Sequence, residues 1–425
     1  MLRSTNSKHT LGDAAARAGA RIMQRCDALA EASLHPEYIE RTYLSSAHAQ
    51  ANKLVEGWMQ EAGMDCWQDS VGNVWGRYAC KDADAPALII GSHLDSVVNA
   101  GKYDGILGVL LGIELGELLG QHRVELPFHL DIVGFCDEEG VRFGATLLGS
   151  LAVCGKWQPE WVALTDANGQ SLADAMTEFG LDPSKITDAM RDPSKVRGFL
   201  EVHIEQGPLL EKRGLPLGVV SDIAGARRFS FVVQGKAGHS GTVPMFMRQD
   251  ALLGASYCIQ LVEEATKRFD VLATVGDISC EPGAVNVIPG SAEFLLDIRS
   301  AKDAVRDRAL AWLLTTMRTN CQRRGLSIDH VEIHSADAVA CDSGWQRLLE
   351  TAMRDSGIEV NSLASGAGHD AMAMTGYTPL GMLFVRCTEG ISHHPDEAII
   401  AEDVASALEV ITRAVCADAG VGVPV

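Results

Sequence analysis

A histidine and two aspartates are spaced so that they could hold a divalent metal ion. His93 follows the apolar run 87–90, Asp95 comes two residues later, and Asp104 lies on a glycine-rich turn. An apolar run bounded by turn residues is typical of a buried parallel strand, and ligands bind at the carboxyl ends of such strands. The alternative is that the aspartates form ordinary turns and His93 is a satisfied polar residue. By itself, this stretch leaves both interpretations open.

Later strand-like segments also end in side chains that can bind metal. They are residues 128–135 leading to Glu138 and Glu139, residues 199–204 with His203, and residues 380–386 before His393 and His394. The carboxyl ends of parallel strands meet at one edge of a sheet, so these placements together predict one crevice. A two-metal hydrolytic site needs His and carboxylate ligands, with one carboxylate shared between ions about 3.5–4 Å apart.

The adjacent pair Glu138 and Glu139 can serve two roles. Neighbouring side chains point in different directions, so one can bind metal while the other accepts a proton and delivers it to a leaving nitrogen. The alternative is that the acidic triplet 137–139 is a solvated turn. The triplet directly follows a continuous apolar strand, which favours the site.

Composition limits the class of protein. With 425 residues the chain predicts two domains, and 47% hydrophobic with 22% charged residues is typical of a soluble globular protein. The formal net charge of -20 argues against nucleic-acid partners and an anionic membrane surface. Eleven cysteines without a Cys-x-x-Cys pair, no signal-like segment and no run of about 18 apolar residues predict a cytoplasmic protein.

The middle of the chain has a different pattern. Strand-like segments at 229–233, 271–279, 292–298 and 330–334 alternate with helix-like segments at 246–267 and 304–323. This β-α-β-β-α-β order predicts a ferredoxin-like unit. Candidate ligands lie on both sides of it, so we expect an α/β catalytic domain in two parts, residues 1–221 and 339–425, with an inserted α+β domain at 222–338. Glycines 105, 108, 112 and 116 do not match a nucleotide-binding loop and indicate close helix packing instead.

Taken together, the motifs resemble the hydantoinase/carbamoylase amidases, within the superfamily of aminoacylases and metallocarboxypeptidase-like exopeptidases. The resemblance runs from about residue 40 to the carboxyl end and is carried by His93-Leu94-Asp95-Ser96, Tyr103-Asp104-Gly105, Glu138-Glu139-Gly140-Val141-Arg142-Phe143, His203-Ile204-Glu205-Gln206-Gly207-Pro208, Gly238-His239-Ser240-Gly241-Thr242-Val243-Pro244-Met245, Asn286-Val287-Ile288-Pro289-Gly290, Ser365-Gly366-Ala367-Gly368-His369-Asp370 and Gly390-Ile391-Ser392-His393.

The resemblance implies a mixed-sheet metallopeptidase-like domain with two divalent metal ions, zinc or manganese, with cobalt or nickel as alternatives. His93 would hold one ion and His203 the other, Asp104 would bridge them, and Glu139 and His393 would complete the ligand sets. Asp95 would orient His93 through its second ring nitrogen, and Glu138 would be the general acid and base. The motif favours His393 over His394 as the ligand.

The inserted domain would be a lid and dimerisation domain. The resemblance implies that His239 reaches the partner subunit's site to stabilise developing negative charge. Gln206, Asn286 and Arg299 would hold the substrate, with Gly368 and His369 on a loop lining the pocket. Arginine suits this role because its fork binds a carboxylate bidentately. Ala226 stands where many relatives have Gln, which weakens the transfer of that polar contact.

The expected function is a binuclear amidohydrolase that cleaves the carbamoyl (ureido) C–N bond of a small carboxylate-bearing substrate. Allantoate is the first candidate and an N-carbamoyl-L-amino acid the alternative. His203 favours this branch, because peptidases of the superfamily tend to carry Asp there. A metallo-exopeptidase or N-acyl amino acid hydrolase, and a non-catalytic small-molecule binding protein on the same fold, are further alternatives. We expect a cytoplasmic homodimer.

Overall fold

The structure is a computed structural model that describes residues 11–424, in two units. The first unit comprises Met1–Ser221, Cys341–Leu363 and His369–Val425, and the second comprises Asp222–Ala340 and Ala364–Gly368. The short segment 364–368, which lies within the range 339–425, therefore groups with the second unit. Among residues 11–424, no helix combines the length and the apolar character needed to cross a membrane.

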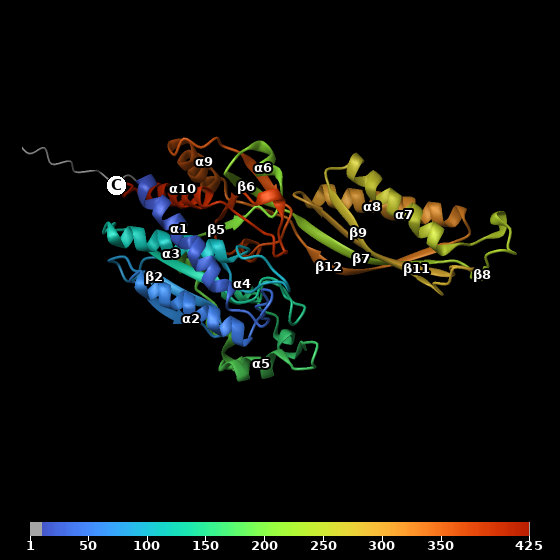
Figure 1. The fold of residues 1–425 in the computed structure, drawn as a ribbon, viewed down its shortest axis with the longest axis horizontal. Helices are drawn as coiled ribbons and strands as arrows, with labels where there is room; N and C mark the ends of the chain where they lie inside the picture. The colour runs from blue at the N-terminus through green and yellow to red at the C-terminus, as the bar shows by residue number, and fades with distance from the viewer. Residues whose placement is uncertain (1–10, 425) are drawn as a thin grey trace, which may run out of the picture. The chain divides into compact units, whose positions relative to one another are not determined.

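The first unit is built on a mixed sheet with the strand order β1-β2-β4-β3-β5-β15-β6. Figure 1 labels β2, β5 and β6 of this sheet. The strands are β1 (Asp65–Gln68), β2 (Val74–Tyr78), β3 (Ala87–His93), β4 (His129–Phe135), β5 (Val196–Ile204), β6 (Leu217–Ile223) and β15 (Leu380–Val385). Two short strands, β13 (Val339–Ala340) and β14 (Ser362–Ser365), also pair with β6. The central strands β4, β3, β5 and β15 are mutually parallel. This α/β architecture confirms the predicted fold class.

The parallel strands are apolar because both faces of the sheet are covered. Every residue of β3, β4 and β15 is buried. The helices of this unit are α1 (Leu11–Ala30), α2 (Ser46–Glu61), α3 (Ile106–Gln121), α4 (Leu148–Val153), α5 (Leu172–Phe179), α6 (Leu209–Arg213), α9 (Ser343–Asp355) and α10 (Ala401–Ala419). Helix α1 packs against α10 and α3, and α9 packs against β15 and α10.

Helix α3 is apolar on nearly all sides because it lies between the sheet and the helices α1 and α10. Its glycines permit this close approach, as predicted. A Cβ atom on Gly108 would lie 2.2 Å from the carbonyl oxygen of Val202 on β5. The one buried carboxylate of the helix, Glu114, is paired with Arg21 and Arg25 of α1. Helix α3 is thereby fixed directly behind the loop that carries Asp104.

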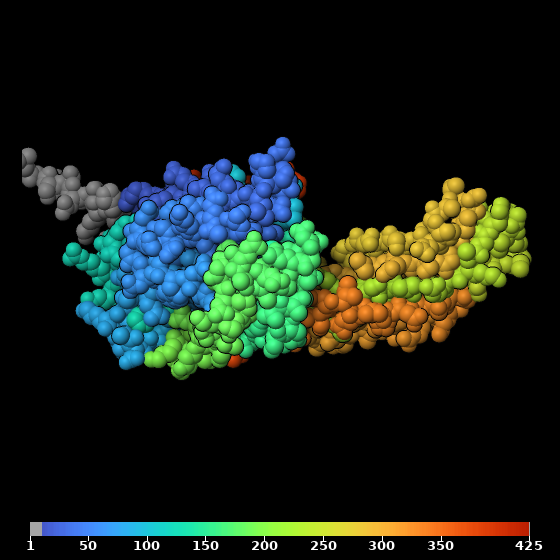
Figure 2. Space-filling model, turned by 90° about the horizontal axis from the view of Figure 1, so that it is seen from below, coloured from blue at the N-terminus to red at the C-terminus, as the bar shows by residue number. Residues whose placement is uncertain are grey.

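A second hydrophobic cluster lies in the segment between β4 and β5. Residues of α4 and α5, including Leu148, Leu172 and Met176, pack with Tyr43 and Val71. On the surface in Figure 2 this segment, in green, adjoins the blue segment that contains α2. The cluster anchors the chain that follows Glu138 and Glu139.

The second unit is a four-stranded antiparallel sheet in the order β12-β7-β11-β9, with two helices on it (Figure 1). Its elements are β7 (Gly225–Gln234), β8 (Gly238–His239), α7 (Ala251–Arg268), β9 (Leu272–Glu281), β10 (Val287–Ile288), β11 (Ser291–Ser300), α8 (Asp303–Arg323) and β12 (Ser327–Ala336). The main strands and helices follow the predicted β-α-β-β-α-β order. The first helix begins at Ala251, later than the predicted residue 246, because Asp250 caps it by accepting the N–H of Leu253 at 3.0 Å.

Candidate metal centre

The predicted ligands of the first unit meet at one edge of its parallel sheet. His93 ends β3, His203 lies near the end of β5, and the segments after β4 and β15 carry Glu139 and His393. Asp104 comes from the loop between β3 and α3. Gly105 closes this loop at φ 71°, and a Cβ there would lie 2.6 Å from the ring of His93. Only glycine therefore allows Asp104 and His93 to approach so closely.

Asp104 lies between two sets of possible ligands. Its Oδ1 is 3.1 Å from Nε2 of His203 and 3.7 Å from Nε2 of His93. Its Oδ2 is 3.1 Å from Nε2 of His393, whose Nε2 is also 3.4 Å from Oε1 of Glu139. Burial raises the pKa of the Asp104 carboxyl, but hydrogen bonds with the three histidines outweigh burial and lower it well below the ordinary value.

This arrangement has the chemistry of a binuclear site. Three sets of side chains bring ligand atoms close enough to share an ion: His93 with Asp104 and His203, Asp104 with Glu139 and His393, and His93 with Glu138 and Glu139. Imidazole and carboxylate are the ligands that zinc and manganese accept, and one carboxylate offers an oxygen to each of two sets. The side chains present therefore fit two divalent ions. His93 falls both in the set with Asp104 and His203 and in the set with Glu138 and Glu139, so the expected division of His93 and His203 between the ions stays a prediction.

Asp95 holds the two glutamates as well as His93. Its Oδ1 accepts the backbone N–H of Glu138 at 2.9 Å, and its Oδ2 accepts that of Glu139 at 3.1 Å. Nδ1 of His93 lies 3.4 Å from Oδ1 and 3.1 Å from the backbone carbonyl oxygen of Asp95. The side chain is 1% exposed, so these contacts form away from solvent. One carboxylate therefore connects the first histidine to the acidic pair.

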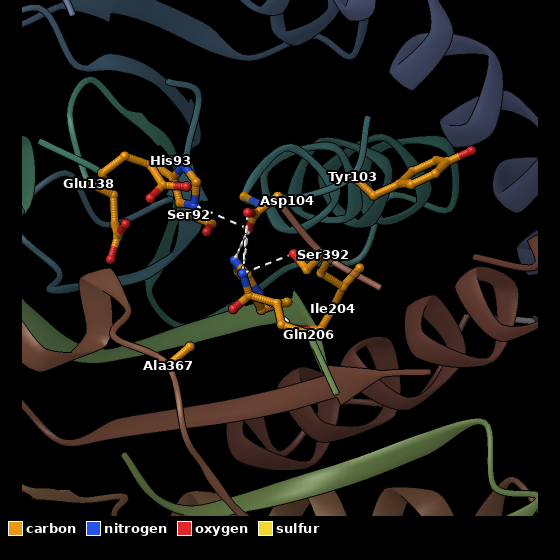
Figure 3. A network of polar contacts seen from close by, with 12 residues as sticks. Ser92, His93, Tyr103, Asp104, Glu138, Ile204, Gln206, Ala367 and Ser392 are labelled. Atoms are coloured by element: carbon orange, nitrogen blue, oxygen red, sulfur yellow. Dashed lines mark hydrogen bonds and ion pairs between the residues drawn. The ribbon is translucent and has the colours of Figure 1, made fainter. Parts of the chain in front are cut away.

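Glu138 lies in a partly buried position beside His93. Its side chain lies next to His93 in Figure 3. Burial raises the pKa of the Glu138 carboxyl well above its ordinary value, and the nearby His93 partly opposes that shift. Glu139 differs in lying within reach of His393. The adjacent glutamates therefore have different neighbours, which is what two different roles require.

Two buried glutamates that the sequence analysis did not identify support the site. Glu397 accepts the N–H groups of Tyr103 at 2.9 Å and Asp104 at 3.2 Å through Oε1, and the hydroxyl of Ser392 at 2.9 Å through Oε2. Glu201 accepts the hydroxyl of Ser92 at 2.7 Å. Glu201 precedes His203 by two residues, so strand alternation points both side chains to the same face of the sheet. That spacing was a signal available in the sequence.

His369 and His394 take positions away from direct ligation. The ring of His369 packs edge-on against His203 with 4.5 Å between centroids, and its side chain is buried. Burial lowers its pKa well below the ordinary value, so it is neutral. The contact places His369 beside His203, and its expected role in lining the substrate pocket stays a prediction. His394 is exposed, with Nδ1 3.6 Å from Asp396, whereas His393 faces Asp104.

Four of the remaining candidates belong to the second unit. His239 and Asn286 lie on neighbouring backbone, because the N–H of Ser240 donates to the carbonyl oxygen of Asn286 at 3.1 Å. Both side chains are exposed. Gly368 ends the segment Ala364–Gly368.

Arg299 is held rigidly within this unit. Its Nε and Nη2 donate to Asp297 at 2.7 and 3.0 Å, and its Nη1 donates to the carbonyl oxygen of Gly366 at 2.8 Å. These bonds leave part of the guanidinium free to bind an anion. Ala226 lies directly opposite Arg299 in the sheet, so the small side chain stands beside this arginine.

Comparison with known proteins agrees with this geometry. The model of Peptidase family M20/M25/M40 matches residues 89–417. An allantoate deiminase of Arabidopsis thaliana is 41% identical over 94% of this chain and 82% of its own length. An N-carbamoyl-L-amino acid amidohydrolase of Geobacillus stearothermophilus is 37% identical over 93% of this chain and 98% of its own.

A solved structure of a related protein has a similar fold over nearly the whole chain. The crystal structure of an amidase of the hydantoinase/carbamoylase family from Burkholderia multivorans has a TM-score of 0.88 and 31% sequence identity, and the match covers 94% of this chain and 98% of that one. The family match, the curated relatives and this structure agree with the resemblance seen in the sequence motifs. The chain is a hydrolase that belongs to Peptidase family M20/M25/M40, among its hydantoinase/carbamoylase amidases.

Proposed function

We propose that this protein is a binuclear metal-dependent amidohydrolase that cleaves the carbamoyl (ureido) C–N bond of a small carboxylate-bearing substrate. The observation that carries the proposal is the carboxylate of Asp104, whose two oxygens face different sets of ligands, His93 with His203 and Glu139 with His393. Allantoate is the first candidate substrate, because a relative named allantoate deiminase is 41% identical to this chain. An N-carbamoyl-L-amino acid is the second candidate, because a relative named N-carbamoyl-L-amino acid amidohydrolase is 37% identical.

The protein's own side chains divide the remaining work. Two bound divalent ions would polarise the substrate's carbonyl group and lower the pKa of a water molecule. Glu138 then accepts the proton of the attacking water and delivers it to the leaving nitrogen. Asp95 keeps Glu138 in place through the backbone bond described above. Burial raises the pKa of the Glu138 carboxyl above its ordinary value, and a carboxyl group of raised pKa suits this role because it holds a proton more readily.

The second unit supplies the substrate contacts in this proposal. Arg299, already oriented by Asp297, binds the substrate's carboxylate, and Asn286 binds its polar groups. We propose that the protein acts as a homodimer in which the second unit is a lid and dimerisation domain. His239 of the partner subunit would then stabilise the negative charge that develops on the carbonyl oxygen.

The test is ammonia release by the full-length protein after removal of metal with a chelator. Mn²⁺ or Zn²⁺ is added back with allantoate, an N-carbamoyl-L-amino acid or a dipeptide as substrate. Metal-dependent ammonia release from one ureido compound is expected and identifies the substrate. Cleavage of the dipeptide alone, followed as release of free amino acids because this reaction yields no ammonia, would make the protein an exopeptidase. No reaction with any of the three compounds would favour a binding protein on this fold.

A further inference from the structure

The side-chain amide of Gln206 lies among the donor atoms of one proposed ion. Its Nε2 is 3.3 and 3.2 Å from the two oxygens of Asp104 and 3.2 Å from Oγ of Ser392, as Figure 3 shows. The same nitrogen is 3.3 Å from Nε2 of His393. Asp104 and His393 are two of the three residues in the set with Glu139. The amide therefore contacts the atoms that an ion in this set would need.

These contacts and metal binding exclude each other for a chemical reason. Nε2 of an imidazole carries either a proton or a single lone pair. Whether Nε2 of His393 donates to Asp104 or accepts from the amide of Gln206, it cannot bind an ion at the same time. Oδ2 of Asp104 lies 3.1 Å from that nitrogen, so an ion between them would also approach the amide nitrogen closely. An amide N–H carries positive charge on its hydrogen, which a cation repels. The set accepts either the amide or the ion.

The amide is held in this place, but not tightly. Ser392, which the amide contacts, is fixed by its hydrogen bond to Glu397 at 2.9 Å. Against this, Oε1 of Gln206 is buried and has no hydrogen-bond partner among the described residues. The opposing contributions make the position one that a cation can displace.

We propose that Gln206 competes with the ion held by Asp104, Glu139 and His393, so that the two ions bind in a fixed order. The set of His93, Asp104 and His203 fills first. In the described residues the amide contacts only Oδ1 of Asp104 in that set, at 3.3 Å, and neither histidine. A carboxylate oxygen has a further lone pair for an ion, which Nε2 of His393 lacks. The second ion displaces the amide, which is then free to turn toward the substrate. Loading of the second ion thereby prepares a substrate contact. This inference rests on the proposed binuclear function.

Calorimetric titration of metal-stripped full-length protein with Mn²⁺ tests the order. The wild-type protein should show two binding steps of different affinity. In Gln206→Ala the second step should become about tenfold tighter, the effect of losing one competing hydrogen bond to a charged group, while the first step does not change. Gln206→Glu has the same shape but replaces the N–H donor with an oxygen ligand, so its second step should be tighter still.

Gln121→Ala is the matched control, because that exposed amide, at the end of α3, bonds only Glu117 in the described structure. Its titration should match that of the wild-type protein, and circular dichroism checks that each variant is folded. A second step that is weaker or unchanged in Gln206→Ala, with two ions bound by the wild-type protein, would overturn the competition alone. A wild-type protein that binds no second ion would overturn the binuclear function as well.

Discussion

Replacing Asp95 with asparagine tests how the acidic pair is positioned. In the native protein each carboxylate oxygen accepts one backbone N–H, from Glu138 at 2.9 Å and from Glu139 at 3.1 Å. Asparagine has only one acceptor oxygen, and its NH₂ group would face the other N–H. One of the two backbone donors therefore loses its partner in a buried place. We expect the segment that carries both glutamates to shift.

The size of the effect follows from the bond that is lost. A hydrogen bond to a charged group contributes about 1.5–3 kcal/mol, which corresponds to about a 10- to 100-fold change in an equilibrium constant. Loss of a group that orients a metal ligand typically weakens metal affinity by about 10- to 100-fold. We therefore expect Asp95→Asn to bind Mn²⁺ about 10- to 100-fold more weakly. At saturating metal, kcat should still fall, because Glu138 is displaced.

Asp342→Asn is the matched control. Asp342 also accepts two successive backbone N–H groups, from Gly344 at 2.8 Å and Trp345 at 3.1 Å, but both bonds go to the same oxygen. Asparagine can reproduce that geometry, and it is as good a helix cap as aspartate. Competition with a chromophoric chelator measures metal affinity in each variant. Native metal affinity and turnover in Asp95→Asn, or an equal loss in Asp342→Asn, would refute the reasoning.

Three further outcomes are expected. Glu138→Gln should retain metal but lose about 10²- to 10⁴-fold in kcat, and a near-normal rate would contradict its role as proton carrier. Mixing this variant with His239→Ala should restore activity, because a hybrid dimer assembles one intact site. No recovery on mixing would contradict the role of His239 in the partner's site. Gly108→Ala should lower the free energy of unfolding, measured in urea, by about 1–3 kcal/mol, because the Cβ of the alanine would lie 2.2 Å from the carbonyl oxygen of Val202. An unchanged urea concentration at the midpoint of unfolding would contradict this packing. Burial lowers the pKa of His48 to about 4, so as pH falls from 7 to 5 the unfolded chain binds a proton that the folded protein does not. The free energy of unfolding should then fall by about 2 kcal/mol between pH 7 and pH 5. His48→Gln should abolish this fall when the free energy is measured by urea unfolding at each pH. The same dependence of the free energy on pH in the variant would show that another group is responsible.

Much of the fold could be predicted because its signals are local. The segments that became β3, β4, β5 and β15 are short, mostly apolar runs bounded by turn residues, a pattern typical of strands covered on both faces. The order of elements in the second unit followed from alternation and helical periodicity in the same way. The start of α7 was predicted five residues too early, because the helix begins only after Asp250, whose side-chain Oδ1 accepts the backbone N–H of Leu253.

The sequence by itself determined which residue types reach the edge of the sheet, because a ligand that follows an apolar strand must emerge where that strand ends. Only the tertiary structure decided how they combine. His93 and His203 share one oxygen of Asp104 because β3 and β5 lie side by side, and His393 meets Asp104 while His394 faces solvent. Glu397, which the sequence analysis did not identify, joined the site through contacts with residues distant in sequence, and Gln206, expected to hold the substrate, contacts Asp104. Such contacts depend on the direction of each side chain in the folded protein, which spacing along the chain does not specify.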